Sequence, residues 1–77
     1  MNISEFTTNV AEQFDDLEGE ILTASTCFRD VSGWSSITAL SIIAMIDEEY
    51  DVQLTGADIR ASNTIQDIFD KVVDKKG

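Results

Sequence analysis

The sequence has no histidine and no proline, and it contains a single cysteine, Cys27. The absence of histidine removes the usual general base near neutral pH and the most common metal ligand in proteins. The single cysteine excludes a disulfide within the chain and is typical of a reducing compartment. There is also no Walker-type phosphate-binding loop. We therefore expect no catalytic residues and no metal site, and the chain is not predicted to be an enzyme.

Basic residues are scarce as well. Five Lys and Arg stand against fifteen Asp and Glu, which gives a formal net charge of −10. Nucleic acids and anionic membrane surfaces are bound through basic surfaces, so neither is an expected partner. No apolar run approaches the roughly 20 residues of a membrane span, and the chain does not open like a signal peptide. We expect a cytoplasmic protein that binds basic protein surfaces and inserts into no membrane.

The N-terminal third of the chain predicts one helix followed by a long loop, within a single domain spanning residues 1–77. A helix from Asn2 to Asp16, with Ser4 as its N-cap, is predicted from apolar residues at spacings of three and four. These residues are Ile3, Phe6, Val10, Phe14 and Leu17. Ser, Thr, Asp and Gly then predict a loop up to Gly33. The apolar side chains of this loop are expected to pack on the core: Ile21, Leu22, Phe28 and Val31.

The second predicted helix runs from about Ser36 to Asp51, with Ser35 or Ser36 as its cap. Its main apolar stripe is Ala39, Ile42, Ile43, Ile46 and Tyr50. Ile37, Leu40 and Met45 widen the apolar surface, so each of them belongs either to the core or to a second face that meets a partner or an acyl chain. Acidic residues crowd the C-terminal end, where the helix dipole disfavours anions. They form either a solvated end or a docking surface.

Two further helices complete the predicted fold. Thr55 is a candidate N-cap for a short helix over 56–60, and the last helix begins near Asn63 and Thr64. The apolar stripe of the last helix is Ile65, Ile68, Phe69, Val72 and Val73. The fold class is all-α, a small three- to four-helix bundle with a long loop after the first helix.

The start of the second helix is the most informative segment. Gly33-Trp34-Ser35-Ser36-Ile37 places a serine at a helix N-terminus, where backbone N–H groups and the helix dipole favour a phosphate. An ordinary N-cap serine is the alternative interpretation. Trp34 either packs on the core or forms a contact surface beside this serine.

This segment resembles the Gly-x-Asp-Ser-Leu signature of the acyl carrier protein family, and Asp47-Glu48-Glu49-Tyr50-Asp51 resembles the acidic-aromatic run that follows it. The resemblance extends over the whole chain. Its register places the modified serine of the family at Ser36, and Ser35 stands where the family has aspartate. Thr38 and Ser41 are neutral where fatty-acid carriers tend to have acids. These departures favour a specialised carrier over a standard fatty-acid one.

The resemblance implies that a phosphopantetheinyl transferase attaches 4′-phosphopantetheine from coenzyme A to Ser36. The arm would carry acyl thioesters for fatty-acid or specialised lipid or polyketide-type biosynthesis. Docking on basic surfaces of acyl-processing enzymes would involve Trp34, Ile37, Leu40, Asp47 and Glu48, and we expect a monomer. A peptidyl or aminoacyl carrier is one alternative. The other is a small acidic interaction domain without a prosthetic group.

Overall fold

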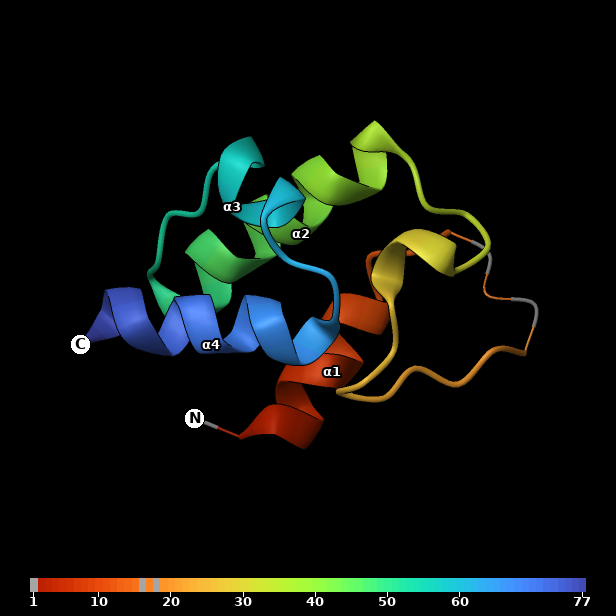
Figure 1. Ribbon diagram of the computed structural model, residues 1–77, viewed down its shortest axis with the longest axis horizontal. Helices are drawn as coiled ribbons and strands as arrows, with labels where there is room; N and C mark the ends of the chain where they lie inside the picture. Colours follow the sequence, from red (N-terminus) through yellow and green to blue (C-terminus); the bar gives the residue numbers. More distant parts are fainter. Residues whose placement is uncertain (1, 16, 18) are drawn as a thin grey trace.

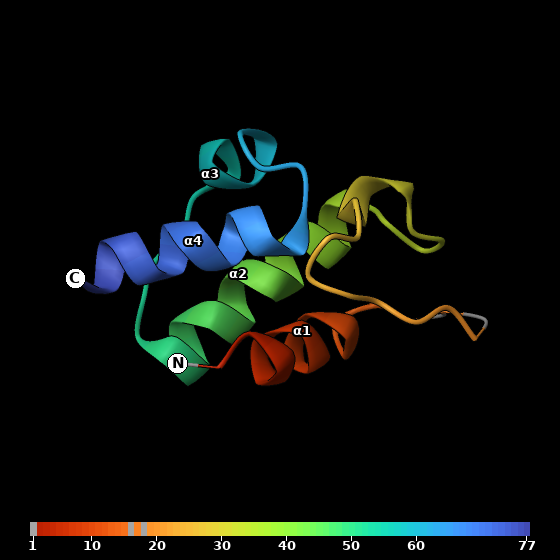
Figure 2. The same cartoon turned by 60° about the horizontal axis from the view of Figure 1, so that its bottom comes forward.

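The computed structural model describes residues 2–15, 17 and 19–77, which form an all-α bundle without β-strands in those ranges. The elements in chain order are α1 (Ile3–Ala11), the 3₁₀ turn η1 (Phe28–Asp30), α2 (Ser36–Tyr50), α3 (Gly56–Arg60) and α4 (Ile65–Lys76). Figures 1 and 2 show α2 between α1 and α3, with α4 running across them. The predicted fold class is confirmed, and the predicted second helix agrees within one residue.

The first helix differs from its prediction at both ends. Asn2, not Ser4, is the N-cap, because its Oδ1 accepts hydrogen bonds from the backbone N–H groups of Ser4 (2.8 Å) and Glu5 (3.3 Å). The helix ends at Ala11, and a turn then carries Phe14 into the core. The apolar spacing therefore predicts correctly which side chains are buried, but the helix itself is shorter than the spacing predicts. The predicted endpoint itself, residue 16, lies outside the described residues.

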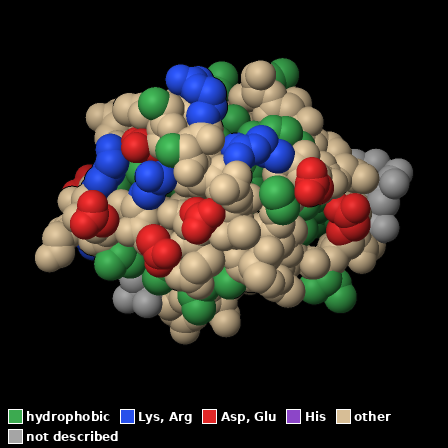
Figure 3. All heavy atoms as spheres, viewed as in Figure 1, with side chains coloured by type: hydrophobic (Ala, Val, Ile, Leu, Met, Phe, Trp, Pro, Cys, Tyr) green, Lys and Arg blue, Asp and Glu red, His purple; other side chains and the backbone are tan. Residues whose placement is uncertain are grey.

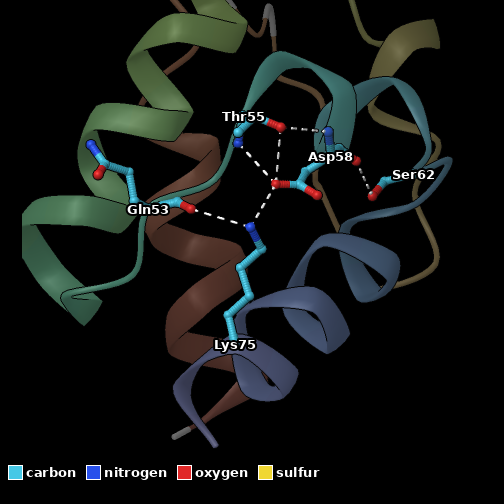
Figure 4. Close-up of polar contacts among 5 residues, drawn as sticks. All are labelled: Gln53, Thr55, Asp58, Ser62 and Lys75. Atoms are coloured by element: carbon cyan, nitrogen blue, oxygen red, sulfur yellow. Dashed lines mark hydrogen bonds and ion pairs between the residues drawn. The ribbon is translucent and has the colours of Figure 1, made fainter.

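Capping boxes begin both C-terminal helices. Thr55 and Asp58 exchange side chain-to-backbone hydrogen bonds at the start of α3, and Thr64 and Asp67 do so at the start of α4. Hydrogen bonds from the backbone at Thr55 and from Lys75 lower the pKa of Asp58 below its usual value. Figure 4 shows Lys75 reaching from α4 to Asp58, with Nζ 3.0 Å from Oδ2. This ion pair ties the C-terminal helix to α3.

The core lies where α1, α2 and α4 meet. The ring of Phe6 lies 5.5 Å from that of Tyr50 and 5.2 Å from that of Phe69, which joins the three helices through aromatic contacts. Most predicted stripe residues of α2 and α4 are buried or half-buried, including Ile42, Ile46, Ile65, Ile68 and Val72. The sequence periodicity thus identified the core-facing sides of these helices.

The part of the long loop over residues 19–35 extends beyond the helices and returns to the bundle (Figures 1 and 2). Phe28 and Val31 are buried and Leu22 is half-buried against the core, as predicted. Ile21 is 86% exposed, so the expectation that it packs on the core is wrong. The loop also covers the start of α4, where Ile65 and Gln66 donate backbone hydrogen bonds to loop carbonyls. These contacts hold η1 and the following turn against the bundle.

Over the described residues, no helix has both the length and the apolar character required to cross a bilayer.

Candidate functional site

The turn before α2 fixes where the two serines lie. Gly33 has φ of 86°, a left-handed conformation that glycine adopts without the steric cost of a Cβ. Its carbonyl accepts a hydrogen bond from Thr38 Oγ1 at 3.0 Å, and the backbone N–H of Trp34 donates to Val31 O at 3.1 Å. The glycine of the sequence motif is therefore a structural requirement of the turn that leads into the helix.

The two adjacent serines have different structural roles. Ser35 is the N-cap of α2, with extended backbone and an Oγ that accepts the backbone N–H of Thr38 at 3.3 Å. Its Oγ also lies 3.2 Å from Thr38 Oγ1. Ser36 is the first residue of the helix, and its side chain is exposed. The Ser36 hydroxyl makes no hydrogen bond with any residue that the structure describes, whereas the Ser35 hydroxyl lies within hydrogen-bond distance of both the backbone N–H and the side-chain hydroxyl of Thr38.

Trp34 combines the two roles that the sequence left open. Its ring centroid lies 5.0 Å from that of Phe28 and 6.2 Å from that of Phe14, so one side of it packs on the anchored loop. The side chain is half-buried, and it also lines a groove that reaches Ser36. The tryptophan therefore fixes the turn before α2 and contributes to the surface beside the serine.

The three residues that widened the apolar surface of α2 separate in the structure. Ile37 is 73% exposed and Leu40 is 65% exposed, whereas Met45 is 7% exposed and belongs to the core. Two large aliphatic side chains thus stand on the first turns of α2, next to the exposed hydroxyl. The described helix has no acidic residue in its first turn, so this end of α2 is apolar and uncharged.

The acids of α2 lie at the opposite end. Asp47, Glu48 and Glu49 are exposed in the last turns of the helix, and Asp51 ends it in a left-handed conformation with φ of 56°. At 1.5 Å per residue, Asp47 lies about 16 Å along the helix axis from Ser36. The structure therefore does not bring the predicted acidic docking residues close to the serine.

A groove of about 390 Å³ between α2 and α3 begins at Ser36. Leu40, Ile43 and Ile59 give it apolar walls, and Arg29 and Arg60 also line it. These two arginines were not predicted as site residues from the sequence. Arg29 is in the loop and Arg60 ends α3, so only the tertiary fold brings them beside Ser36. No local sequence pattern predicts that these two residues line the groove.

Comparison with known families gives a match to the phosphopantetheine attachment site family over residues 5–72. The match covers most of the chain, so the protein belongs to this family of carrier proteins, which hold a 4′-phosphopantetheine group and are not catalytic themselves. Carrier domains of this kind are modified by phosphopantetheinyl transferases. The comparison with solved structures found no match.

The surroundings of Ser36 suit such a group. The prosthetic group supplies a thiol on a long flexible arm that is joined to the protein through a phosphodiester. An exposed serine hydroxyl at the start of a helix can accept that ester without displacing a packed side chain. The adjoining groove offers apolar walls and two guanidinium groups, and the nearest part of α2 contributes no negative charge.

Proposed function

We propose that this protein is an acyl carrier that bears 4′-phosphopantetheine on Ser36 and carries acyl groups as thioesters. The observation that supports Ser36 most directly is the difference between the two serines. Both serines are exposed, but the Ser35 hydroxyl accepts the capping hydrogen bond, whereas the Ser36 hydroxyl has no partner among the described residues. The whole chain, residues 1–77, then acts as one carrier domain.

The groove beside Ser36 supports an acyl cargo over an aminoacyl or peptidyl one. Its walls include Leu40, Ile43 and Ile59, and burial of each CH₂ of a chain contributes about 0.8 kcal/mol. Polar aminoacyl groups gain nothing comparable from such walls. The pathway is fatty-acid or specialised lipid or polyketide-type biosynthesis. The uncharged first turns of α2 favour a specialised set of partner enzymes.

Docking would use both ends of α2. Trp34, Ile37 and Leu40 form an apolar contact area around the arm, and Asp47 and Glu48 face basic patches of acyl-processing enzymes. Exposed charge pairs of this kind are weak and are screened by salt, which suits a carrier that must leave each enzyme quickly. The chain would carry out this transport as a cytoplasmic monomer.

Intact-mass measurement after incubation with coenzyme A and a promiscuous phosphopantetheinyl transferase tests the attachment site. We expect the wild type to gain one phosphopantetheine and Ser36→Ala to gain none. Ser35→Asp is the matched control, because it removes the neighbouring hydroxyl while keeping a side chain that can cap the helix. This variant should be modified fully.

Two results would contradict the proposal. No mass gain with several transferases would favour the acidic interaction domain without a prosthetic group. A mass gain on Ser36→Ala that is lost in Ser35→Asp would assign the arm to Ser35.

The cargo class is tested by loading the arm from octanoyl-coenzyme A or alanyl-coenzyme A with the same transferase. Partial burial of the octanoyl chain should raise the melting temperature above that of the alanyl form. Equal melting temperatures, or a higher value for the alanyl form, would argue against an acyl cargo held in the groove and would favour the aminoacyl alternative.

A further inference from the structure

The two arginines at the groove are cations without a carboxylate partner in the described part of a chain whose net charge is −10. Among the described residues, the acceptors of Arg29 are all neutral: Ile59 O (3.2 Å), Ser62 O (2.6 Å) and Asn63 Oδ1 (2.9 Å). Its guanidinium also lies 4.9 Å from the ring centroid of Phe28. These contacts hold the Arg29 charge in place without neutralising it.

Arg60 is exposed and has neither a hydrogen bond nor an ion pair with any described residue. Lys75, by contrast, pairs with Asp58, and Lys76 donates to the Tyr50 carbonyl at 2.9 Å. Figure 3 shows basic side chains scattered among acidic ones on the face that carries α3 and α4, so carboxylates are not scarce on this surface. Arg60 therefore lacks a described carboxylate partner because of its position at the α2–α3 groove, and not because this surface has few carboxylates.

The backbone at the start of α3 leaves room for this side chain. A Cβ built on Gly56 would lie 3.3 Å from Arg60 Nη1, so the guanidinium folds back across the glycine. Gly56, Arg60 and Ser36 all line the same groove. A phosphodiester on Ser36 would consequently enter a groove that already contains guanidinium groups, at the end of α2 that has no acidic side chain in its first turn.

We propose that Arg60 pairs with the phosphodiester of the arm on Ser36 and keeps the arm against the α2–α3 groove while the carrier is free in solution. This inference rests on the proposed attachment at Ser36. Guanidinium groups bind phosphate oxygens with two parallel hydrogen bonds, which a lysine ammonium cannot match in geometry. Arg29 adds a second, fixed positive charge to the same groove. Leu40, Ile43 and Ile59 contact the rest of the arm.

The same arginine is also suited to an acidic side chain of a partner enzyme. Its place on the groove that begins at Ser36 favours the arm, because the phosphodiester is attached to that serine and has a much higher local concentration than a partner. Binding to a partner is therefore an alternative outcome of the following experiment.

The experiment compares apo and holo forms of the wild type, Arg60→Gln and Lys71→Gln, with the holo forms confirmed by intact mass. Lys71→Gln removes the same charge from a half-buried position on α4, outside this groove. At low salt, we expect the wild-type holo form to melt about 3 °C above the apo form, the shift typical of one exposed charge pair in a domain of this size. This gain should disappear in Arg60→Gln and in about 0.5 M NaCl, and it should persist in Lys71→Gln.

A second measurement is the ³¹P chemical shift of the arm, which reports on the phosphodiester directly. We expect it to differ from the wild-type value in Arg60→Gln and to be unchanged in Lys71→Gln. Arg60→Lys should retain part of the thermal gain, because it keeps the charge but not the paired hydrogen bonds.

The possible failures are distinguishable. If Ser36 accepts no arm, the proposed attachment falls and the pairing falls with it. If Ser36 is loaded but the holo–apo difference and the ³¹P shift are the same in Arg60→Gln and in the wild type, only the pairing is overturned. Slower loading of Arg60→Gln by the transferase, together with an unchanged holo–apo difference, would also overturn it and assign Arg60 to partner binding.

Discussion

Replacement of Ser35 tests whether this residue has the structural role that the fold gives it. The resemblance to the acyl carrier signature predicts an aspartate at the position of Ser35, and in this chain the Ser35 Oγ accepts the Thr38 backbone N–H at 3.3 Å. Serine and aspartate are both strong N-cap residues. The cap function of this position is therefore expected to survive the change in residue type, while alanine should abolish it.

The magnitude follows from the loss of one cap. Ser35→Ala leaves the Thr38 N–H without its side-chain acceptor and also removes the contact between the two hydroxyl groups. Loss of an N-cap costs about 1 kcal/mol, which corresponds to a fall in melting temperature of about 4–8 °C in a domain of this size. Ser35→Asp keeps the acceptor and places an anion at the helix N-terminus, where the dipole adds about 0.3–1 kcal/mol of stability. Self-repulsion in a chain of net charge −10 offsets part of that gain.

The assay is thermal unfolding of the apo protein followed by circular dichroism at about 0.15 M salt, with urea titration as an independent measure of stability. We expect Ser35→Ala to melt clearly below the wild type and Ser35→Asp to melt near it. A Ser35→Ala variant as stable as the wild type would refute the cap assignment. A Ser35→Asp variant that loses as much stability as Ser35→Ala would refute the argument that the two residue types are equivalent here.

Three further outcomes are expected. Phe28→Ala should lower the free energy of unfolding by about 3–5 kcal/mol and leave the chain largely unfolded by circular dichroism. Ile21→Ala, in the same loop but 86% exposed, should change the free energy of unfolding by no more than about 0.5 kcal/mol. Equal losses would contradict the anchoring role of Phe28. The melting temperature should rise with NaCl as self-repulsion is screened, and a flat salt dependence would mean that the acids are already balanced locally. The pKa of Asp58 is lower in the folded state than in the unfolded state, where it is near 3.8. The ionised carboxylate therefore contributes its full stabilisation above pH 3.8, and this contribution is lost progressively as the pH falls through the folded pKa. Asp58→Asn should therefore melt below the wild type near pH 7, and the difference should shrink below about pH 3.8; a constant difference would contradict this linkage.

Local signals in the sequence predicted most of the fold because helix stripes and caps depend on neighbouring residues. The capping role of Thr55 is one example and is confirmed. The apolar stripe of α4 is another, and it is confirmed except at Val73, which is 44% exposed. The errors at α1 have the same origin. Asn2 and Ser4 are both good caps, and Phe14 fits the helical spacing although it reaches the core through a turn.

The environment of the candidate site was much less predictable. Because α2 is apolar on several sides, spacing alone could not separate the buried Met45 from the exposed Ile37 and Leu40. That separation depends on which sides α1 and α3 cover. Arg29 reaches the groove through hydrogen bonds to residues about thirty positions away, such as Ile59, and no short-range pattern encodes such contacts. The sequence alone was enough to nominate Ser36 as the candidate serine, but it did not predict the cations beside it.

The distribution of charge along α2 leads to a final expectation about partner enzymes. The acids at Asp47 and Glu48 lie about 16–18 Å from Ser36 along the helix. The surface nearest the arm is apolar because Ile37 and Leu40 are exposed there. Distant exposed charges mainly accelerate encounter, while apolar contacts near the centre of an interface mainly slow dissociation. Asp47→Asn should therefore lower the association rate with an acyl-processing enzyme and weaken its salt dependence. Leu40→Ala should raise the dissociation rate and leave the salt dependence intact. Stopped-flow measurement at several ionic strengths separates the two, and the opposite assignment would place the centre of the interface at the acidic end of α2.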